Sequence, residues 1–205
     1  MEKSRRSVER ADAVLQATVD LLAEVGYPAL TIDAVAARAH SSKATIYKSW
    51  PTKTALVVAV AAQLGPVAIP VLDKSHSLTE SVRAIAAAAH SITVGRLGRL
   101  VLALDAAGRS DPVIMAAVQE HLAAPLDRAV SAALDELQAD GRIDAQADTT
   151  LASRVILSVL VDRGLARGDV VSDDDLNRFV RDWLVPVLTP KHLGTRTPGP
   201  TAGPG

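Results

Sequence analysis

Residues 31–53 read TIDAVAARAHSSKATIYKSWPTK, and this stretch decides the fold of the chain. The pattern predicts two short helices joined by a tight turn at His40-Ser41. Thr31 and Ser42 are suitable N-caps for the two helices, because a hydroxyl there can accept a hydrogen bond from a first-turn backbone N–H. Ile46 is expected to anchor the second helix in a small apolar core.

The outward face of the second helix is chemically distinctive. At about 100° per residue, Lys43, Ala44, Tyr47 and Lys48 fall within about 140° of one another, and Ile46 lies on the opposite side. Lysine can reach guanine acceptors or phosphates, tyrosine can bind phosphate oxygens, and a small residue permits close approach. We therefore expect this helix to enter the major groove of DNA.

Charge is distributed unevenly along the chain, although the net charge is only −1. No acidic residue occurs between Asp33 and Asp73, and a one-sided cationic window of this kind favours a polyanion partner. The alternative is an ordinary solvated face, which usually mixes both signs. Lys53 follows Pro51-Thr52 in the first turn of a fourth helix, where a cation opposes the helix dipole, so we expect a phosphate nearby. The cations of the window are Arg38, Lys43, Lys48 and Lys53.

Composition narrows the class of protein. The chain has 205 residues, is rich in Ala, Val and Leu, and contains only 2% aromatic residues, which predicts an all-α fold. It has no cysteine, so disulfides, thiolate chemistry and cysteine-bound metals are excluded. The N-terminal MEKSRRSVERAD is too charged for a secretory signal. Residues 54–72 carry no charge, but glycine and prolines interrupt them, so we expect a buried helix rather than a membrane span, and a cytoplasmic location.

Helical periodicity and breakers divide the chain into two domains and a tail. A helix over residues 7–25, ended by Gly26, completes a three-helix helix-turn-helix DNA-binding domain over residues 1–52, with a connecting helix starting in 53–64. Residues 65–190 are expected to form a helical ligand-binding and dimerisation domain, and the Pro- and Gly-rich residues 191–205 a disordered tail. In the second domain the predicted helices span residues 78–95, 97–107, 112–139 (kinked at Pro125), 149–167 and 173–188, with Gly108, Gly141 and Gly168 at helix ends and Ser172 as an N-cap.

Residues 11–63 resemble the DNA-binding domain of the tetracycline-repressor (TetR) family of bacterial transcription regulators. The resemblance covers about a quarter of the chain. Four positions depart from the family pattern: His40 replaces a turn glycine, Ser41 a buried apolar residue, Ala44 a glycine and Trp50 a frequent phenylalanine. The matching landmarks are Gly26-Tyr27, Thr31-Ile32, Val35-Ala36, Ala39, Ser42, Thr45-Ile46-Tyr47, Trp50-Pro51-Thr52-Lys53 and Ala55-Leu56.

The resemblance implies a ligand-responsive regulator, expected to be a repressor, that binds a palindromic operator in double-stranded DNA as a homodimer. DNA-binding residues are then expected at Thr31, Ser42, Lys43, Ala44, Thr45, Tyr47, Lys48 and Lys53. In this family the last two helices usually pair with their copies; the alternative is that they merely close the core. The residues expected at the dimer interface are Leu151, Val155, Val159, Leu176, Phe179, Val180, Trp183 and Val187.

A small-molecule effector of unknown identity is the second implied partner. No aromatic residue occurs between Thr54 and Arg178, so an aliphatic or compact ligand is favoured over a flat aromatic one. For the polar candidates, a surface position or a helix-end partner is the alternative. The candidate ligand-binding residues are Ile85, His90, Leu102, Asp105, Met115 and His121.

No motif in the sequence points to an enzyme, a cofactor or a metal site. Gly-rich phosphate loops, G-x-S-x-G and HExxH are absent, and the histidines are too isolated to form a metal centre. A helical protein-interaction module that retains the helix-turn-helix without an effector response remains an alternative, although the cationic window argues against it.

Overall fold

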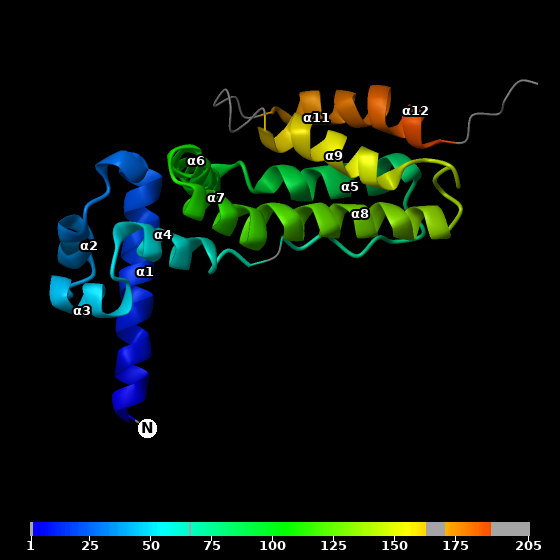
Figure 1. The fold of residues 1–205 in the computed structure, drawn as a ribbon. Helices are drawn as coiled ribbons and strands as arrows, with labels where there is room; N and C mark the ends of the chain where they lie inside the picture. Colours follow the sequence, from blue (N-terminus) through cyan, green and yellow to red (C-terminus); the bar gives the residue numbers. More distant parts are fainter. Residues whose placement is uncertain (1, 66, 163–170, 190–205) are drawn as a thin grey trace, which may run out of the picture.

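The computed structural model describes residues 2–65, 67–162 and 171–189. Every regular element in these ranges is a helix, which confirms the predicted all-α fold (Figure 1). None of the described helices combines the length and apolarity that crossing a membrane requires. The predicted tail and residues 163–167 of the predicted 149–167 helix, with Gly168, lie outside the described residues.

The N-terminal part is a head of four helices. The first helix begins at Glu2, earlier than the predicted start at residue 7. The prediction followed the apolar stripe, but charged residues with good helix propensity extend the helix toward the N-terminus, and Arg5 pairs with Glu9 one turn further on. Its backbone leaves the helical conformation at Gly26, where φ is +73°, as the sequence predicted. The helices are α1 (Glu2–Ala29), α2 (Ile32–Arg38), α3 (Lys43–Ser49) and α4 (Lys53–Ala61).

The second part stacks its helices in layers (Figure 1). Helix α5 packs on α8 on one side and on α9 and the last helices on the other, while α6 and α7 lie at the junction with the head. The elements are α5 (Leu78–Ser91), α6 (Gly95–Ser110), α7 (Pro112–Val118), η1 (Gln119–Ala123), α8 (Ala124–Ala139), α9 (Thr149–Leu157), η2 (Ser158–Asp162), α11 (Asp173–Phe179), η3 (Val180–Leu184) and α12 (Val185–Leu188).

Pro125 perturbs the long helix of residues 112–139 as expected, but by widening it rather than by a simple kink. The π-helical turn η1 ends at Ala123, two residues before the proline, which lacks an N–H and whose ring displaces the carbonyl four residues earlier. Pro186 stands in the same relation to η3, a break that the sequence analysis missed in the predicted 173–188 helix.

Gly108 does not end a helix, contrary to the sequence prediction. It lies inside α6, where an added Cβ would come within 3.2 Å of the Cα and 3.0 Å of the Cε of Met115 on α7. The glycine therefore serves the close approach of α6 and α7. Gly141 does follow the end of α8 with φ +71°, and Ser172 caps α11, as predicted.

The junction between head and second part is built by two helix pairs, α1 with α6 and α4 with α7. Asp20 of α1 forms an ion pair with Arg96 of α6. Thr54, in the first turn of α4, donates a hydrogen bond of 2.8 Å to Asp111, the N-cap of α7. This hydrogen bond is the largest contribution that lowers the pKa of Asp111. The start of α4 is thereby tied to a residue 57 positions further along the chain.

Candidate nucleic-acid interface

The α2–turn–α3 unit has the predicted geometry. His40 takes a positive φ of +48°, which a histidine tolerates better than most residues, so the missing turn glycine does not break the motif. The N–H of Ser41 then bonds to the carbonyl of Ala36 at 3.0 Å and closes the turn. Ile46 is the one residue of α3 that is fully buried, and it packs in the core that also holds Val35.

Hydroxyl side chains cap all three short helices of the head. Thr31 accepts from the N–H of Ala34 at 3.1 Å, and Ser42 accepts from that of Thr45 at 3.1 Å, as predicted. At the start of α4, the Thr52 hydroxyl accepts from the N–H of Ala55 at 3.0 Å. Each cap fixes where its helix begins, and so fixes which side chains of α3 project outward.

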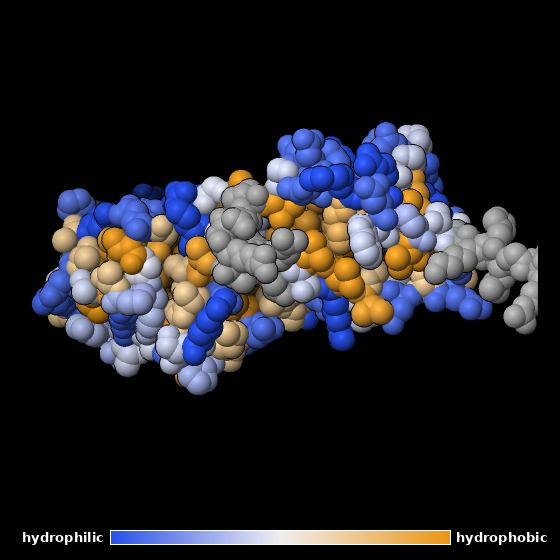
Figure 2. All heavy atoms as spheres, turned by 90° about the horizontal axis from the view of Figure 1, so that it is seen from above, coloured by the Kyte–Doolittle hydropathy of each residue, from blue (hydrophilic) through white to orange (hydrophobic). Residues whose placement is uncertain are grey.

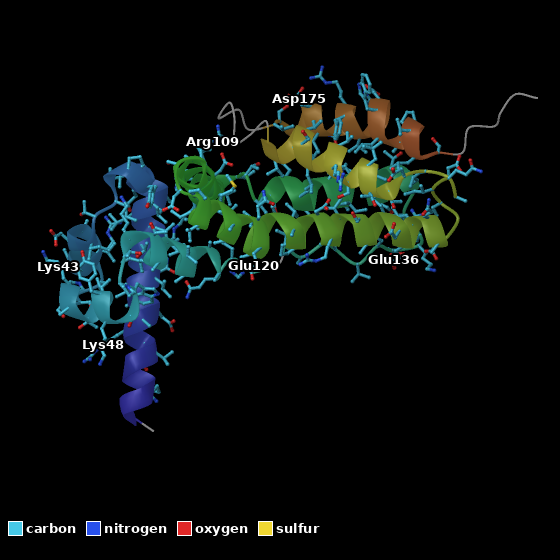
Figure 3. All side chains as sticks on the ribbon, in the orientation of Figure 1. Lys43, Lys48, Arg109, Glu120, Glu136 and Asp175 are labelled. Atoms are coloured by element: carbon cyan, nitrogen blue, oxygen red, sulfur yellow. The ribbon has the colours of Figure 1, made fainter. Side chains whose placement is uncertain are left out.

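The remaining residues of α3 are all exposed. They include the predicted outward set Lys43, Ala44, Tyr47 and Lys48, and Tyr47 keeps nearly half of its surface in solvent. In Figure 3, Lys43 and Lys48 lie on different sides of α3, with Lys43 next to α2. The face therefore has the residues and the exposure that contact with a DNA groove requires.

Two cations of the acid-free window are paired with acids that precede it. The Nζ of Lys43 lies 2.5 Å from Asp33 in the first turn of α2, and Arg38 bonds to Glu24 of α1 at 2.7 Å. The hydrogen bond and charge of Asp33 raise the pKa of Lys43. Counting charges along the sequence overstated the free positive charge of the head, because it ignored acids that the fold brings alongside.

Lys53 has an intramolecular partner that was not predicted from the sequence. Its ammonium lies 4.2 Å from the centroid of the Tyr27 ring, an arrangement that stabilises a cation. Partial burial lowers its pKa. The Tyr27 hydroxyl in turn lies 3.4 Å from the hydroxyl of Thr54. A nearby phosphate is thus not needed to explain a lysine at this helix start, although the ammonium remains available to one.

Asp33→Asn is expected to tighten binding to non-specific DNA, because the variant frees Lys43 and removes a negative charge from the contact face. An exposed pair of this kind contributes little, so the gain should be modest, up to about fivefold at low salt. One added phosphate contact should steepen the dependence of log K on log salt by about 0.9. Fluorescence anisotropy with random-sequence duplex over a salt series measures both quantities.

Glu120→Gln is the matched control for that measurement. It removes the same charge from η1 in the second part, at the exposed position labelled in Figure 3. Its binding curve should superimpose on that of the parent protein. Equal or weaker binding by Asp33→Asn would show that Lys43 does not reach the DNA backbone.

The residues predicted at the dimer interface fall into three groups by their exposure. Leu176 and Val180 are each 1% exposed, so the core of their own chain covers both side chains. The stripe on the last helix splits because positions four apart, continued by Leu184 and Leu188, face the chain's own core. Val159 and Phe179 are half-buried, while four apolar residues stay largely exposed: Leu151 (58%), Val155 (41%), Trp183 (70%) and Val187 (64%).

We call these four exposed residues, Leu151, Val155, Trp183 and Val187, the apolar patch. Figure 2 looks down on α9 and α11–α12 and shows hydrophobic residues gathered there beside strongly hydrophilic ones. Exposed apolar surface of this kind is typical of sites at which proteins bind one another.

The six candidate ligand-binding residues fall in two regions. Ile85 and His90 lie on α5, which packs on α8 and the last helices, and both are buried. His90 bonds to Thr93 at 3.1 Å, the helix-end role that the sequence left open. The other four lie on α6, α7 and η1, close to the junction with the head. Leu102 of α6 is exposed, and Asp105 of α6 pairs with Arg109. Met115 of α7 and His121 of η1 are half-buried.

Comparison with known proteins agrees with this arrangement. The family described as "Bacterial regulatory proteins, tetR family" matches residues 14–60. The helix-turn-helix transcriptional regulator YdeS of Bacillus subtilis is 30% identical over 173 residues, covering 84% of this chain and 85% of that protein. The DNA-binding transcriptional repressor TetR of Mycobacteroides abscessus is 28% identical over 194 residues, covering 90% of this chain and 97% of its own length. The structure of Salmonella enterica GusR shares the fold, with a TM-score of 0.67 and 20% identity over 87% of this chain and 95% of its own.

The head contains a helix-turn-helix whose second helix, α3, is exposed, and the relatives are transcriptional regulators. Together these findings define a DNA-binding transcriptional regulator. The chain belongs to the TetR family. The resemblance stated from the landmarks of residues 11–63 is thereby confirmed.

Proposed function

We propose that the chain is a homodimeric repressor that binds a palindromic operator in the cytoplasm and is released by a small-molecule effector. Residues 1–52 read DNA, residues 65–190 bind the effector and the second copy, and the connection of residues 53–64 joins these two parts. The DNA contacts come from Thr31, Ser42, Lys43, Ala44, Thr45, Tyr47, Lys48 and Lys53.

The observation that supports release by an effector is the hydrogen bond between Thr54 and Asp111. Thr54 follows Lys53 at the start of α4, and Asp111 caps the α7 helix of the second part. A ligand that binds better to one arrangement of α6 and α7 therefore changes the position of α4, and with it the position of the head.

The observation that supports a dimer is the apolar patch. Two copies joined through it carry two α3 helices, and a two-fold dimer reads two half-sites about 34 Å apart. A single short recognition helix would bind only weakly.

The test is selection of genomic fragments with the purified full chain, followed by affinity measurement on the recovered site. Binding should fall in the range of about 10⁻⁸ to 10⁻¹¹ M and weaken steeply with salt, and the site should be palindromic. Compounds handled by the products of the neighbouring genes are then tested for release. Binding that is insensitive to salt, or no enrichment over random fragments, would refute the proposal.

A further inference from the structure

The burial of Ile46 orients every other side chain of α3. At about 100° per residue, Ala44 and Lys48 each lie about 160° from Ile46, one on either side of the line opposite to it. Tyr47 and Thr45 lie about 100° from Ile46, on the two flanks. Ala44 and Lys48 thus form the ridge of α3 that points most directly away from the head, and both are exposed.

The paired lysine does not belong to this ridge. Lys43 lies about 60° from Ile46 and is drawn toward α2 by Asp33 at 2.5 Å. In this position its ammonium can contact the phosphates of the DNA backbone but not the base edges in the groove. Tyr47 and Thr45 carry hydroxyls on the flanks, where the phosphates of the two strands border the groove. The ridge therefore holds one methyl group and one ammonium group.

We propose that Ala44 and Lys48 are the base-reading residues of α3: the methyl of Ala44 contacts the C5-methyl of a thymine, and Lys48 contacts a guanine. This inference rests on the proposed operator binding and adds the chemistry of the half-site. The C5-methyl of thymine is the apolar group that the four ordinary bases present in the major groove, and alanine is a residue that contacts it. Guanine offers the O6 and N7 acceptors that suit an ammonium.

The spacing of the two residues predicts the spacing of the two bases. Side chains four apart on a helix have Cβ atoms about 5–6 Å apart, and base pairs are stacked about 3.4 Å apart. The thymine and the guanine should therefore be separated by one or two base-pair steps. Because alanine is short, the helix axis can approach the bases closely enough for this methyl to reach them.

The test replaces each thymine of one half-site in turn by deoxyuridine, which removes the C5-methyl and leaves the hydrogen-bonding groups unchanged. At one position the affinity should fall about fourfold, the equivalent of burying one methyl at about 0.8 kcal/mol. Ala44→Gly should bind thymine and deoxyuridine at that position equally. Glycine also weakens the helix, but that loss is the same for both duplexes and cancels in the ratio.

Ala37→Gly is the matched control, since it too removes one methyl from an exposed helical residue of the head, but from α2. It should keep the fourfold preference for thymine. A preference that survives in Ala44→Gly, or the absence of any methyl-sensitive thymine in the half-site, overturns the assignment of Ala44.

A second arm tests Lys48 with 7-deazaguanine, which lacks the N7 acceptor. Replacing the guanine one or two steps from the sensitive thymine should weaken binding by the parent chain and leave binding by Lys48→Met unchanged. Equal loss for both proteins overturns the assignment of Lys48. Failure of the proposed function gives a different result. The parent chain then retains no genomic fragment in preference to random DNA, so there is no operator in which bases could be replaced.

Discussion

Trp183→Glu is expected to convert the proposed dimer into monomers and to weaken operator binding roughly a hundredfold or more. The indole keeps 70% of its surface exposed in the isolated chain and is the largest side chain of the apolar patch. A glutamate enclosed there by a second copy must be buried as a charge without a partner or be neutralised, at a cost of several kcal/mol. Each 1.4 kcal/mol is a factor of ten in the association constant, so dimers should dissociate at micromolar concentration.

Operator affinity falls with the dimer because the two heads are then no longer linked. A dimer binds its second half-site at a high effective concentration, whereas a monomer retains only the weak contacts of one α3 helix. Sedimentation equilibrium measures the first effect, and binding to a full palindrome and to a single half-site measures the second. The variant should lose its advantage on the palindrome and keep its affinity for the half-site.

Val113→Glu is the matched control, since Val113 is 60% exposed at the start of α7, outside the apolar patch. It adds the same charge at an exposed apolar position and should leave the dimer intact. Val155→Asp provides a second variant from the α9 side of the patch, and circular dichroism checks that each chain stays folded. A Trp183→Glu chain that remains dimeric would place the interface elsewhere.

The local signals of the head were readable from sequence because they depend on near neighbours. Thr31, Ser42 and Gly26 act within one helical turn, so residue type and spacing are enough to predict them. The departure at His40 was also judged correctly, since tolerance of positive φ is a property of the residue itself.

The features that sequence missed depend on distant parts of the chain. Pairing of Lys43 with Asp33 follows from how α2 and α3 cross, and the tie between Thr54 and Asp111 joins residues 57 positions apart. Burial of Leu176 and Val180 against their own chain was missed for a related reason. A helical stripe shows that residues share a face, but not whether their own chain or another one covers it.

The second large effect is expected for Ile46→Ala, which should abolish operator binding while leaving the dimer intact. Ile46 has no exposed surface and is the fully buried residue of α3, so the packing of this helix on the head depends on it. Truncating a buried isoleucine to alanine costs about 2–5 kcal/mol. A seven-residue helix cannot persist in water without such packing, so the loss should be concentrated in α3 and the turn before it.

Ile143→Ala is the matched control, because Ile143 is almost as deeply buried but follows α8 in the second part. It should lower the thermal midpoint of the chain without faster exchange in the head. Hydrogen exchange resolved by segment separates the two variants: Ile46→Ala should accelerate exchange over residues 40–50 and leave α8 and α9 protected. Retention of operator affinity by Ile46→Ala would mean that contacts outside α3 carry the binding, because the exposed face of α3 is held in place by this one buried side chain.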